Sequence, residues 1–365
     1  MLQALIADRI FTGEDWFSNH AIIVNDDKVI DIVPEADIPT EAEIERNDGC
    51  IIAPAFIDLQ MYGASGSLLA VDPHANTLQK MYEYSLAGGA SYFLPTVATN
   101  TYDVIYACID AVKDYWIKDG KGVLGLHIEG PWINTRRTGA HVEAFIHSPT
   151  IEQVKELLDY GKGIIKMITL APEICSGKII ELIQSYNIVV SAGHSDASYE
   201  QATSVFDNQV SLATHLYNAM SPLHHRAPGM VGAILHHPSV MASIVADEYH
   251  VDFSAISIAK TMMKERLFYI TDAVTETTSG YYQHQLIVEK YEAGGILSGS
   301  ALTMAKAVKN GVLHAGIDLA ESLRMASLFP AKAIGLDDEI GRIKKGYKAD
   351  FVILDEDLHV VQKIS

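Results

Sequence analysis

The middle of the chain alternates between short apolar runs and longer segments whose apolar residues recur at helical spacing. Eight apolar runs predict strands, and these end near Gln60, Thr96, Glu129, Ala171, His194, His215, Asp247 and Asp272. Two of the segments between them, 104–116 and 179–186, predict clear amphipathic helices. Strand and helix repeated eight times predict an α/β fold of the (β/α)8 TIM-like barrel type, and an open doubly wound sheet is the alternative.

The positions of glycine and of polar residues separate these two architectures. A doubly wound sheet is expected to carry a GxGxxG phosphate turn after its first strand, and Ala64-Ser-Gly-Ser67 does not match it. The polar residues that interrupt the apolar runs fall at the C-terminal ends of the predicted strands, where barrel enzymes build their active sites. This pattern favours the barrel.

Both ends of the chain are richer in strand-forming residues than the middle. Short runs over 2–11, 20–25 and 28–33 are separated by turn residues, which is typical of a small antiparallel unit. Residues 340–355 predict two further strands joined by a Lys-Gly turn. We therefore expect residues 1–51 and 334–365 to form one small β-sandwich domain, and residues 52–333 to form the barrel.

Composition restricts the partners and the compartment. With 365 residues, 48% of them apolar and 20% charged, the chain resembles an ordinary globular protein large enough for one big barrel or two domains. A formal net charge of -19 argues against nucleic acid or an anionic membrane as a partner, since both need a basic face. No signal peptide or membrane-length apolar run is visible, and the three cysteines match no metal or redox spacing. We expect a cytoplasmic protein.

Three predicted strand ends carry the ligand types of a catalytic metal site. Glu129 ends an apolar strand, and a buried carboxylate is costly unless a cation or hydrogen-bond donors face it. His194 and His215 end two other strands of the same barrel. One carboxylate and two imidazoles with an open fourth position suit a catalytic zinc or similar divalent ion. The alternative is a structural Glu129 paired with Arg or Lys, because such pairs look similar in sequence.

The first strand bears on the number of metal ions. Asp58, Gln60 and Tyr62 share one face of that strand, where histidines would have offered two more ligands. Glutamine and tyrosine are poor ligands, so we expect one tightly held divalent metal per chain. Zinc is the leading candidate, and iron or cobalt would also suit this ligand set.

Asp272 is the candidate general acid and base. It follows an apolar strand, and a carboxylate beside a metal-activated water can take the water's proton and pass it to a leaving group. A helix cap or a salt bridge is the alternative role. Its place at a strand end of a barrel favours the catalytic role.

Several loop residues are candidates for binding a substrate. Asn218 lies just beyond a strand, where amide and backbone groups can bind a polar ligand. Arg226, in a proline-bounded loop with two histidines, offers the fork of donors that suits phosphate, although a lone loop Arg is more often a solvated surface charge. His141 and His250 follow the third and seventh predicted strands. A single His is usually structural, and these two become candidates because their loops open on the proposed site face.

Seven segments together resemble the family of N-acetylglucosamine-6-phosphate deacetylases within the amidohydrolase superfamily. They are Ala53-Pro-Ala-Phe-Ile-Asp-Leu-Gln60, His127-Ile-Glu-Gly-Pro131, Ser191-Ala-Gly-His194, Thr214-His-Leu-Tyr-Asn-Ala-Met220, Arg226-Ala-Pro-Gly229, Ile270-Thr-Asp-Ala273 and Ser298-Gly-Ser-Ala-Leu-Thr-Met304. The resemblance runs through nearly the whole chain, and the motifs are specific when taken jointly. The first strand departs from it: members carry His-x-His or Gln-x-Asn, whereas this chain has Gln60-Met-Tyr62.

The resemblance implies a metal-dependent barrel with a small β-sandwich that hydrolyses N-acetylglucosamine-6-phosphate to glucosamine-6-phosphate and acetate. It would make Glu129, His194 and His215 the metal ligands and Asp272 the general acid and base. The residues that would line the sugar-phosphate site are Ala140, His141, Asn218, Ala219, Arg226, His250, Leu302, Thr303 and Met304. It also implies a homodimer with parts of the phosphate site near the partner subunit.

Three functions remain after this comparison of motifs. The first is the sugar-phosphate deacetylase, which the loop around Arg226 favours. The second is an amidohydrolase that acts on another N-acyl amino sugar phosphate or on a cyclic amide. The third is a non-catalytic barrel that binds a sugar phosphate, and the presence of three metal-ligand candidates together with Asp272 argues against it, since a binding module needs no such set.

Overall fold

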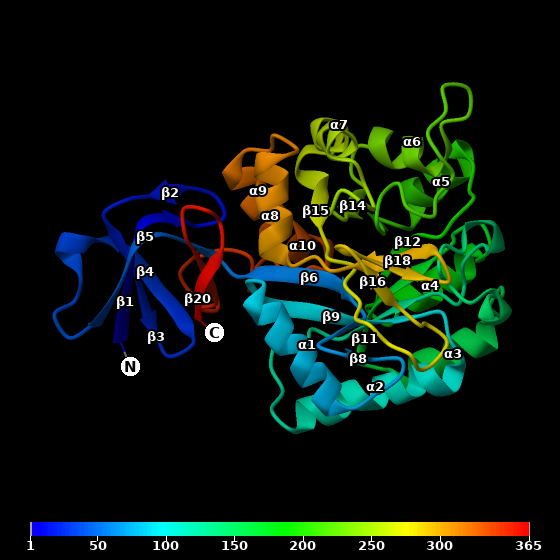
Figure 1. The fold of residues 1–365 in the computed structure, drawn as a ribbon, viewed down its shortest axis with the longest axis horizontal. Helices are drawn as coiled ribbons and strands as arrows, with labels where there is room; N and C mark the ends of the chain where they lie inside the picture. The colour runs from blue at the N-terminus through cyan, green and yellow to red at the C-terminus, as the bar shows by residue number, and fades with distance from the viewer. Residues whose placement is uncertain (1, 365) are drawn as a thin grey trace. The chain divides into compact units, whose positions relative to one another are not determined.

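The computed structural model describes residues 2–364 and forms two compact units (Figure 1). The first unit takes in the chain up to Asp58, the segment Ser85–Tyr92 and the chain from Thr303 onward. The second unit takes in Leu59–Tyr84 and Phe93–Leu302. The domain boundaries expected from the sequence stay a prediction, because compactness does not report which segments fold on their own.

Strands from both ends of the chain form one sheet in the first unit. Its order is β20-β19-β5-β1-β3-β4, with β2 paired to β1. The strands are β1 (Leu2–Phe11), β2 (Trp16–Phe17), β3 (His20–Asn25), β4 (Lys28–Pro34), β5 (Glu43–Pro54), β19 (Phe351–Leu354) and β20 (Val360–Ile364). The expected β unit from both termini is therefore a single hydrogen-bonded sheet.

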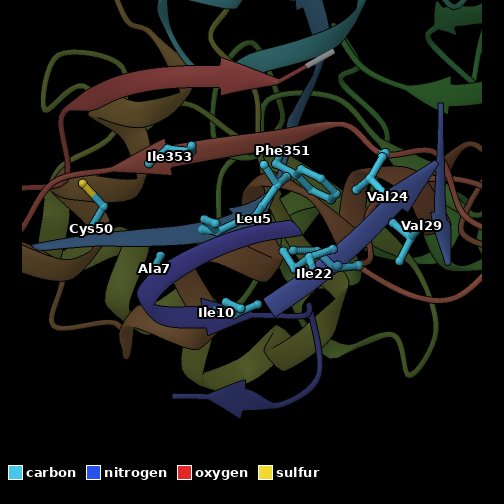
Figure 2. Close-up of a cluster of buried hydrophobic side chains, with 12 residues drawn as sticks. Leu5, Ala7, Ile10, Ile22, Val24, Val29, Cys50, Phe351 and Ile353 are labelled. Carbon is cyan, nitrogen blue, oxygen red and sulfur yellow. The ribbon is translucent and has the colours of Figure 1, made fainter. Parts of the chain in front are cut away.

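An apolar cluster of buried side chains packs on one face of this sheet (Figure 2). Leu5 and Ala7 of β1 point into it together with Ile22 of β3, Ile52 of β5 and other residues, while Ala4 and Ile6 belong to a second cluster. This division follows from the strand period, because successive side chains point to opposite faces.

The sequence predicted two strands over residues 340–355, and the prediction of the first strand is wrong. Only β19 forms, and its antiparallel partners are β20 and β5 rather than residues 340–346. Gly341 and Gly346 both adopt positive φ, and the backbone between them turns to bond other loops, with the amide of Ile343 donating to the carbonyl oxygen of Thr12. Ile343 is buried in the apolar cluster although it lies outside any strand. Its apolar side chain therefore gave the sequence the appearance of a strand.

Eight strands form the barrel expected from the sequence. Their order is β15-β14-β13-β12-β11-β10-β9-β6, and the pairings from β9 to β15 are parallel. The strands are β6 (Phe56–Met61), β9 (Ala90–Ala98), β10 (Leu126–Glu129), β11 (Ile165–Leu170), β12 (Val189–Ala192), β13 (Leu212–Ala213), β14 (Met241–Ile244) and β15 (Leu267–Tyr269). Most of their residues are buried, as expected for strands covered on both faces.

The two edge strands of this sheet are β6 and β15, and the end of β6, with the residue after it, hydrogen-bonds to the segment that follows β15. The amide of Asp272 donates to the carbonyl oxygen of Gln60 at 3.0 Å, and the amide of Tyr62 donates to that of Ala273 at 2.8 Å. Met61 and Ala273 form a parallel bridge. The barrel is therefore nearly closed, which confirms the predicted fold class over a doubly wound sheet.

Helices alternate with the strands as expected. They are α1 (Ala75–Ala87), α2 (Tyr102–Ile117), α3 (Ile151–Tyr160), α4 (Gly177–Gln184), α5 (Tyr199–Asn208), α6 (Gly229–His236), α7 (Phe253–Met263), α8 (Met304–Leu313), α9 (Leu319–Ala326) and α10 (Leu328–Ala333). The predicted amphipathic helices correspond to α2 and α4. Thr101 caps α2 by accepting from the amide of Val104, and Ile105, Cys108 and Ile109 form part of its buried face.

Two small sheets extend from the loops at the C-terminal ends of the strands. One is the hairpin of β7 (Gly63–Ala64) and β8 (Ser67–Leu68). The other is the antiparallel sheet of β16 (Gln285–Ile287), β17 (Lys290–Ala293) and β18 (Ile296–Ser300), which follows the last barrel strand. Within the described part of the chain, the helices are too short or too polar to cross a membrane.

Candidate active site and metal centre

The site is built where four barrel strands end, and Glu129 is the last residue of one of them, β10. His194, His215 and Asp272 each follow the last residue of β12, β13 and β15 by two or three positions. All three have left-handed backbones, with φ values of 47°, 38° and 56°. Non-glycine residues adopt this conformation infrequently, at a cost on the order of 1–3 kcal/mol, although Asp and His do so more readily than most residues. Here it turns the chain sharply at the strand end.

Glu129 is the centre of the cluster and is 1% exposed. Its Oε1 lies 2.9 Å from His215 Nε2 and 3.4 Å from His194 Nε2, and these two nitrogens are 3.1 Å apart. Its Oε2 lies 3.2 Å from His141 Nε2. The described neighbours that contact its carboxylate are His, Gln and Tyr rather than Arg or Lys, which argues against the structural ion pair considered above.

The donor set fits a divalent metal ion. A tetrahedral zinc with bonds of about 2.0–2.1 Å holds its ligand atoms about 3.3–3.4 Å apart. The distances among Glu129 Oε1, His194 Nε2 and His215 Nε2 are 2.9, 3.1 and 3.4 Å, so the three atoms need to move apart only slightly to hold such an ion. His194 Nδ1 lies 2.8 Å from the carbonyl oxygen of Arg137 and must donate to it, which leaves Nε2 with a lone pair. Glu129, His141 and His194 also place one ligand atom each within 4.8 Å of one another. The structure therefore contains a Glu/His/His cluster that could bind a metal.

The two remaining histidines differ in how their outer nitrogens are held. His141 Nδ1 lies 2.7 Å from Thr99 Oγ1, a hydroxyl that can donate, so His141 can keep its proton on Nε2 and donate to Glu129 Oε2. His215 Nδ1 is buried and has no hydrogen-bond partner among residues 2–364. The ring of His215 is thus oriented through its Nε2, which faces Glu129 and His194.

Electrostatics keep the carboxylate charged and one imidazole neutral. Burial raises the pKa of Glu129, but the three neighbouring histidines outweigh it and hold the pKa well below its usual value. Burial and the neighbouring His194 lower the pKa of His141 to about 4, despite the opposing effect of Glu129. Burial also disfavours a charge on His215, yet the hydrogen bond and charge of Glu129 raise its pKa. The site therefore concentrates negative charge at Glu129.

The loop after β10 depends on a glycine. Gly130 has φ +78°, and a Cβ at this position would lie 2.1 Å from Thr99 Oγ1. That hydroxyl is the partner of His141 at 2.7 Å, and its single proton can serve either His141 Nδ1 or the carbonyl oxygen of Glu129, 3.3 Å away. Gly130 therefore allows the backbone to pass close to Thr99 directly after Glu129.

Asp272 lies on the other side of the cluster and is 8% exposed. Its Oδ1 accepts from Gln60 Nε2 at 2.8 Å, and its Oδ2 lies 3.5 Å from His250 Nε2. Asp247 holds His250 through Nδ1 at 2.6 Å. Burial raises the pKa of Asp272 above its usual value, in spite of the opposing histidines. A carboxyl group with a raised pKa is suited to exchange a proton near neutral pH.

These groups line one cavity of about 170 Å³. Its wall contains the predicted residues Glu129, His194, His215, Asp272, Ala140, His141, Asn218, Ala219 and His250. Among the described residues that line it, positive charge can come only from histidine, since no Lys or Arg is present.

Four predicted substrate residues do not line this cavity. Arg226 is exposed on the loop between β13 and α6. Leu302 and Met304 are buried, and Thr303 caps α8 by accepting from the amide of Lys306. Their role in binding a substrate stays a prediction.

Two polar lining residues were missed from the sequence. Tyr282 donates its hydroxyl proton to the carbonyl oxygen of Thr99 at 2.6 Å, and His284 bonds Ser298 Oγ at 2.8 Å. Both belong to the segment that carries β16–β18. The only signal for them was the length of that segment between the last barrel strand and α8, which exceeds an ordinary strand–helix loop.

Comparison with known proteins identifies the relatives of this chain. Residues 51–364 match the amidohydrolase family, and residues 2–50 match the NagA composite domain. The chain is 32% identical to the N-acetylglucosamine-6-phosphate deacetylase of Haemophilus influenzae and also 32% identical to the N-acetylgalactosamine-6-phosphate deacetylase of Escherichia coli O157:H7, with 99% of this chain and 97% of each relative covered. The crystal structure of N-acetylglucosamine-6-phosphate deacetylase from Pasteurella multocida superposes with a TM-score of 0.95 at 32% identity, covering 100% of this chain and 98% of that one.

Proposed function

This chain belongs to the amidohydrolase family, and we propose that it hydrolyses the N-acetyl amide of N-acetylglucosamine-6-phosphate to glucosamine-6-phosphate and acetate. The observation that carries the proposal is the convergence of His194 and His215 on one oxygen of Glu129, beside a buried Asp272. Metal-dependent amide hydrolysis requires a metal site with an open position and a group that moves a proton. The names of the full-length relatives support the choice of substrate.

Glu129, His194 and His215 are the proposed ligands of one divalent metal ion, with zinc as the leading candidate and iron or cobalt as alternatives. When bound, such an ion acts as a Lewis acid and makes water a stronger acid. Geometry supports His215 over His141 as the third ligand, because His215 Nε2 lies beside Glu129 Oε1 and His194 Nε2, whereas His141 Nε2 lies beside Oε2 and can remain a donor. His141 would then donate to the acetyl carbonyl oxygen, where negative charge develops.

Asp272 is the proposed general acid and base. It would accept a proton from the attacking water and deliver it to the amide nitrogen, which is a poor leaving group without that proton. The hydrogen bond from Gln60 holds one carboxylate oxygen, so the other faces the side of His250. The raised pKa of Asp272 supports its acting as an acid after it has acted as a base.

The remaining residues would bind the sugar phosphate. Ala140, Asn218, Ala219 and His250 line the cavity and are proposed to contact the sugar and its phosphate. Arg226, on the loop that follows Ala219, is proposed to pair with the phosphate through its guanidinium. The segment Leu302-Thr-Met304 is proposed to complete the site. A homodimer and a cytoplasmic location are proposed as well, on the family resemblance and on composition.

One observation favours a second substrate. The two curated relatives act, by name, on sugars that differ in one stereocentre, and both are 32% identical to this chain. Acetate release from N-acetylglucosamine-6-phosphate, N-acetylgalactosamine-6-phosphate and unphosphorylated N-acetylglucosamine should therefore be measured side by side. We expect the highest kcat/KM for the first sugar and a large loss without phosphate. A higher kcat/KM for N-acetylgalactosamine-6-phosphate would make that sugar the proposed substrate instead. No acetate release from any of the three sugars would refute the deacetylase proposal.

A further inference from the structure

We propose that Tyr62 is a positioning residue that commits Glu129 to bind the metal through Oε1 alone, because the Tyr62 hydroxyl occupies Oε2. The inference rests on the proposed function for the identity of the metal ligands. It concerns a residue at which the chain departs from the Gln-x-Asn and His-x-His patterns of the family it resembles.

The two oxygens of the Glu129 carboxylate face different groups. Oε1 faces His194 Nε2 and His215 Nε2, the two nitrogens that are 3.1 Å apart, and it also lies 3.2 Å from Gln60 Nε2. Oε2 is bonded by the Tyr62 hydroxyl and lies 3.2 Å from His141 Nε2. Each oxygen therefore has its own set of partners, and the tyrosine belongs to the set opposite the proposed ligands.

The direction of the hydrogen bonds gives the hydroxyl proton to Glu129. Gln60 Nε2 lies 2.7 Å from the Tyr62 oxygen and 2.8 Å from Asp272 Oδ1, and its longest contact, at 3.2 Å, is with Glu129 Oε1, so its two protons point most directly at the first two acceptors. Tyr62 accepts from Gln60 and donates its own proton to Oε2. A continuous chain of hydrogen bonds thus joins Asp272, Gln60, Tyr62 and Glu129.

The tyrosine is itself held in place before any metal binds. Its backbone amide donates to the carbonyl oxygen of Ala273 at 2.8 Å, and its carbonyl oxygen accepts from the amide of Leu69 at 3.0 Å. Its ring packs against an apolar cluster of Leu68, Ala98 and Tyr282. Because backbone and ring are both fixed, the hydroxyl cannot follow Oε2 if the carboxylate rotates, and the carboxylate is held in one orientation.

This restraint matters because a carboxylate can bind a metal with one oxygen or with both. A catalytic site needs an open coordination position, which a second oxygen from Glu129 would take. Partners of metal ligands orient them, and loss of such a partner typically costs 10- to 100-fold in metal affinity or activity. Tyr62 would therefore protect the open position as well as strengthen metal binding.

The test is Tyr62→Phe, which removes the hydroxyl and keeps the ring. Apoprotein of wild type and variant would be loaded with Co²⁺, whose visible d–d absorption weakens as its coordination number rises, and the Co²⁺ Kd would be measured by competition with a chromophoric chelator. We expect weaker d–d absorption in the variant and a Kd that is roughly 10- to 100-fold higher. Thermal unfolding of both apoproteins checks that the variant is folded.

Tyr282→Phe is the matched control, because Tyr282 lines the same cavity but directs its hydroxyl to the carbonyl oxygen of Thr99. We expect its Co²⁺ spectrum to match the wild type. An unchanged spectrum in Tyr62→Phe would overturn the proposal whatever its Kd, and so would the same change in both variants. Because no sugar is used, the result is independent of the substrate, and failure of the wild type to bind Co²⁺ at all would instead count against the proposed function.

Discussion

Replacing Asp272 with asparagine tests the mechanism most directly. Asparagine has nearly the same shape, and its side-chain oxygen can still accept from Gln60 Nε2, which lies 2.8 Å from Asp272 Oδ1. Its amide cannot take up a proton and release it again. We therefore expect Asp272→Asn to keep the fold, the bound metal and the KM for the sugar phosphate, while kcat falls.

The structure indicates how large the loss should be. A positioned acid or base is worth a factor of about 100 to 10,000, or about 2.7 to 5.4 kcal/mol of activation free energy. Among the described residues that line the cavity, the only carboxyl groups are Asp272 and Glu129, and Glu129 faces histidines. His250 Nε2, 3.5 Å from Asp272 Oδ2, is the nearest group that could replace it, and it is already held by Asp247. We expect a loss in the upper part of the range.

The assay is acetate release from N-acetylglucosamine-6-phosphate, with the metal content of the same samples measured by elemental analysis. Asp318→Asn serves as the control, because Asp318 caps α9 at an exposed position and asparagine caps helices equally well. Near-normal kcat in Asp272→Asn with metal still bound would show that another group moves the proton and would refute the role of Asp272.

Three further predictions concern the metal and the phosphate. Purified protein should retain about one divalent metal ion per chain after dialysis, because Gln60 and Tyr62 are poor ligands, and a content near two would contradict this. His215→Ala should lose most of this metal, whereas His141→Ala should keep it and lose kcat; the reverse pattern would make His141 the ligand. Arg226→Ala should raise KM for the phosphorylated sugar roughly 10- to 100-fold with little change in kcat, since the phosphate is remote from the amide and bound alike in ground and transition states. If KM stays at the wild-type value, Arg226 is a solvated surface charge.

Much of the barrel could be predicted because its strands are buried on both faces. Such strands appear as largely apolar runs, and polar residues gather near the C-terminal end of each run, where Glu129, His194, His215 and Asp272 lie. The error over residues 340–350 has the same origin. Ile343 is buried in an irregular segment, and a buried loop residue cannot be told from a strand residue by polarity alone.

Sequence alone thus determined the fold class and which side chains share one end of the barrel, because hydrophobic periodicity is a local property of the chain. It could not determine which atoms face each other. Tyr62 reads from the sequence as a failed metal ligand, yet its hydroxyl bonds Glu129 because the closing of the barrel joins its backbone to Ala273. The proton positions on His194 and His141 likewise depend on a carbonyl oxygen of Arg137 and a hydroxyl of Thr99, both distant in sequence. Such pairings arise only when segments far apart along the chain are packed together, so the tertiary structure decided them.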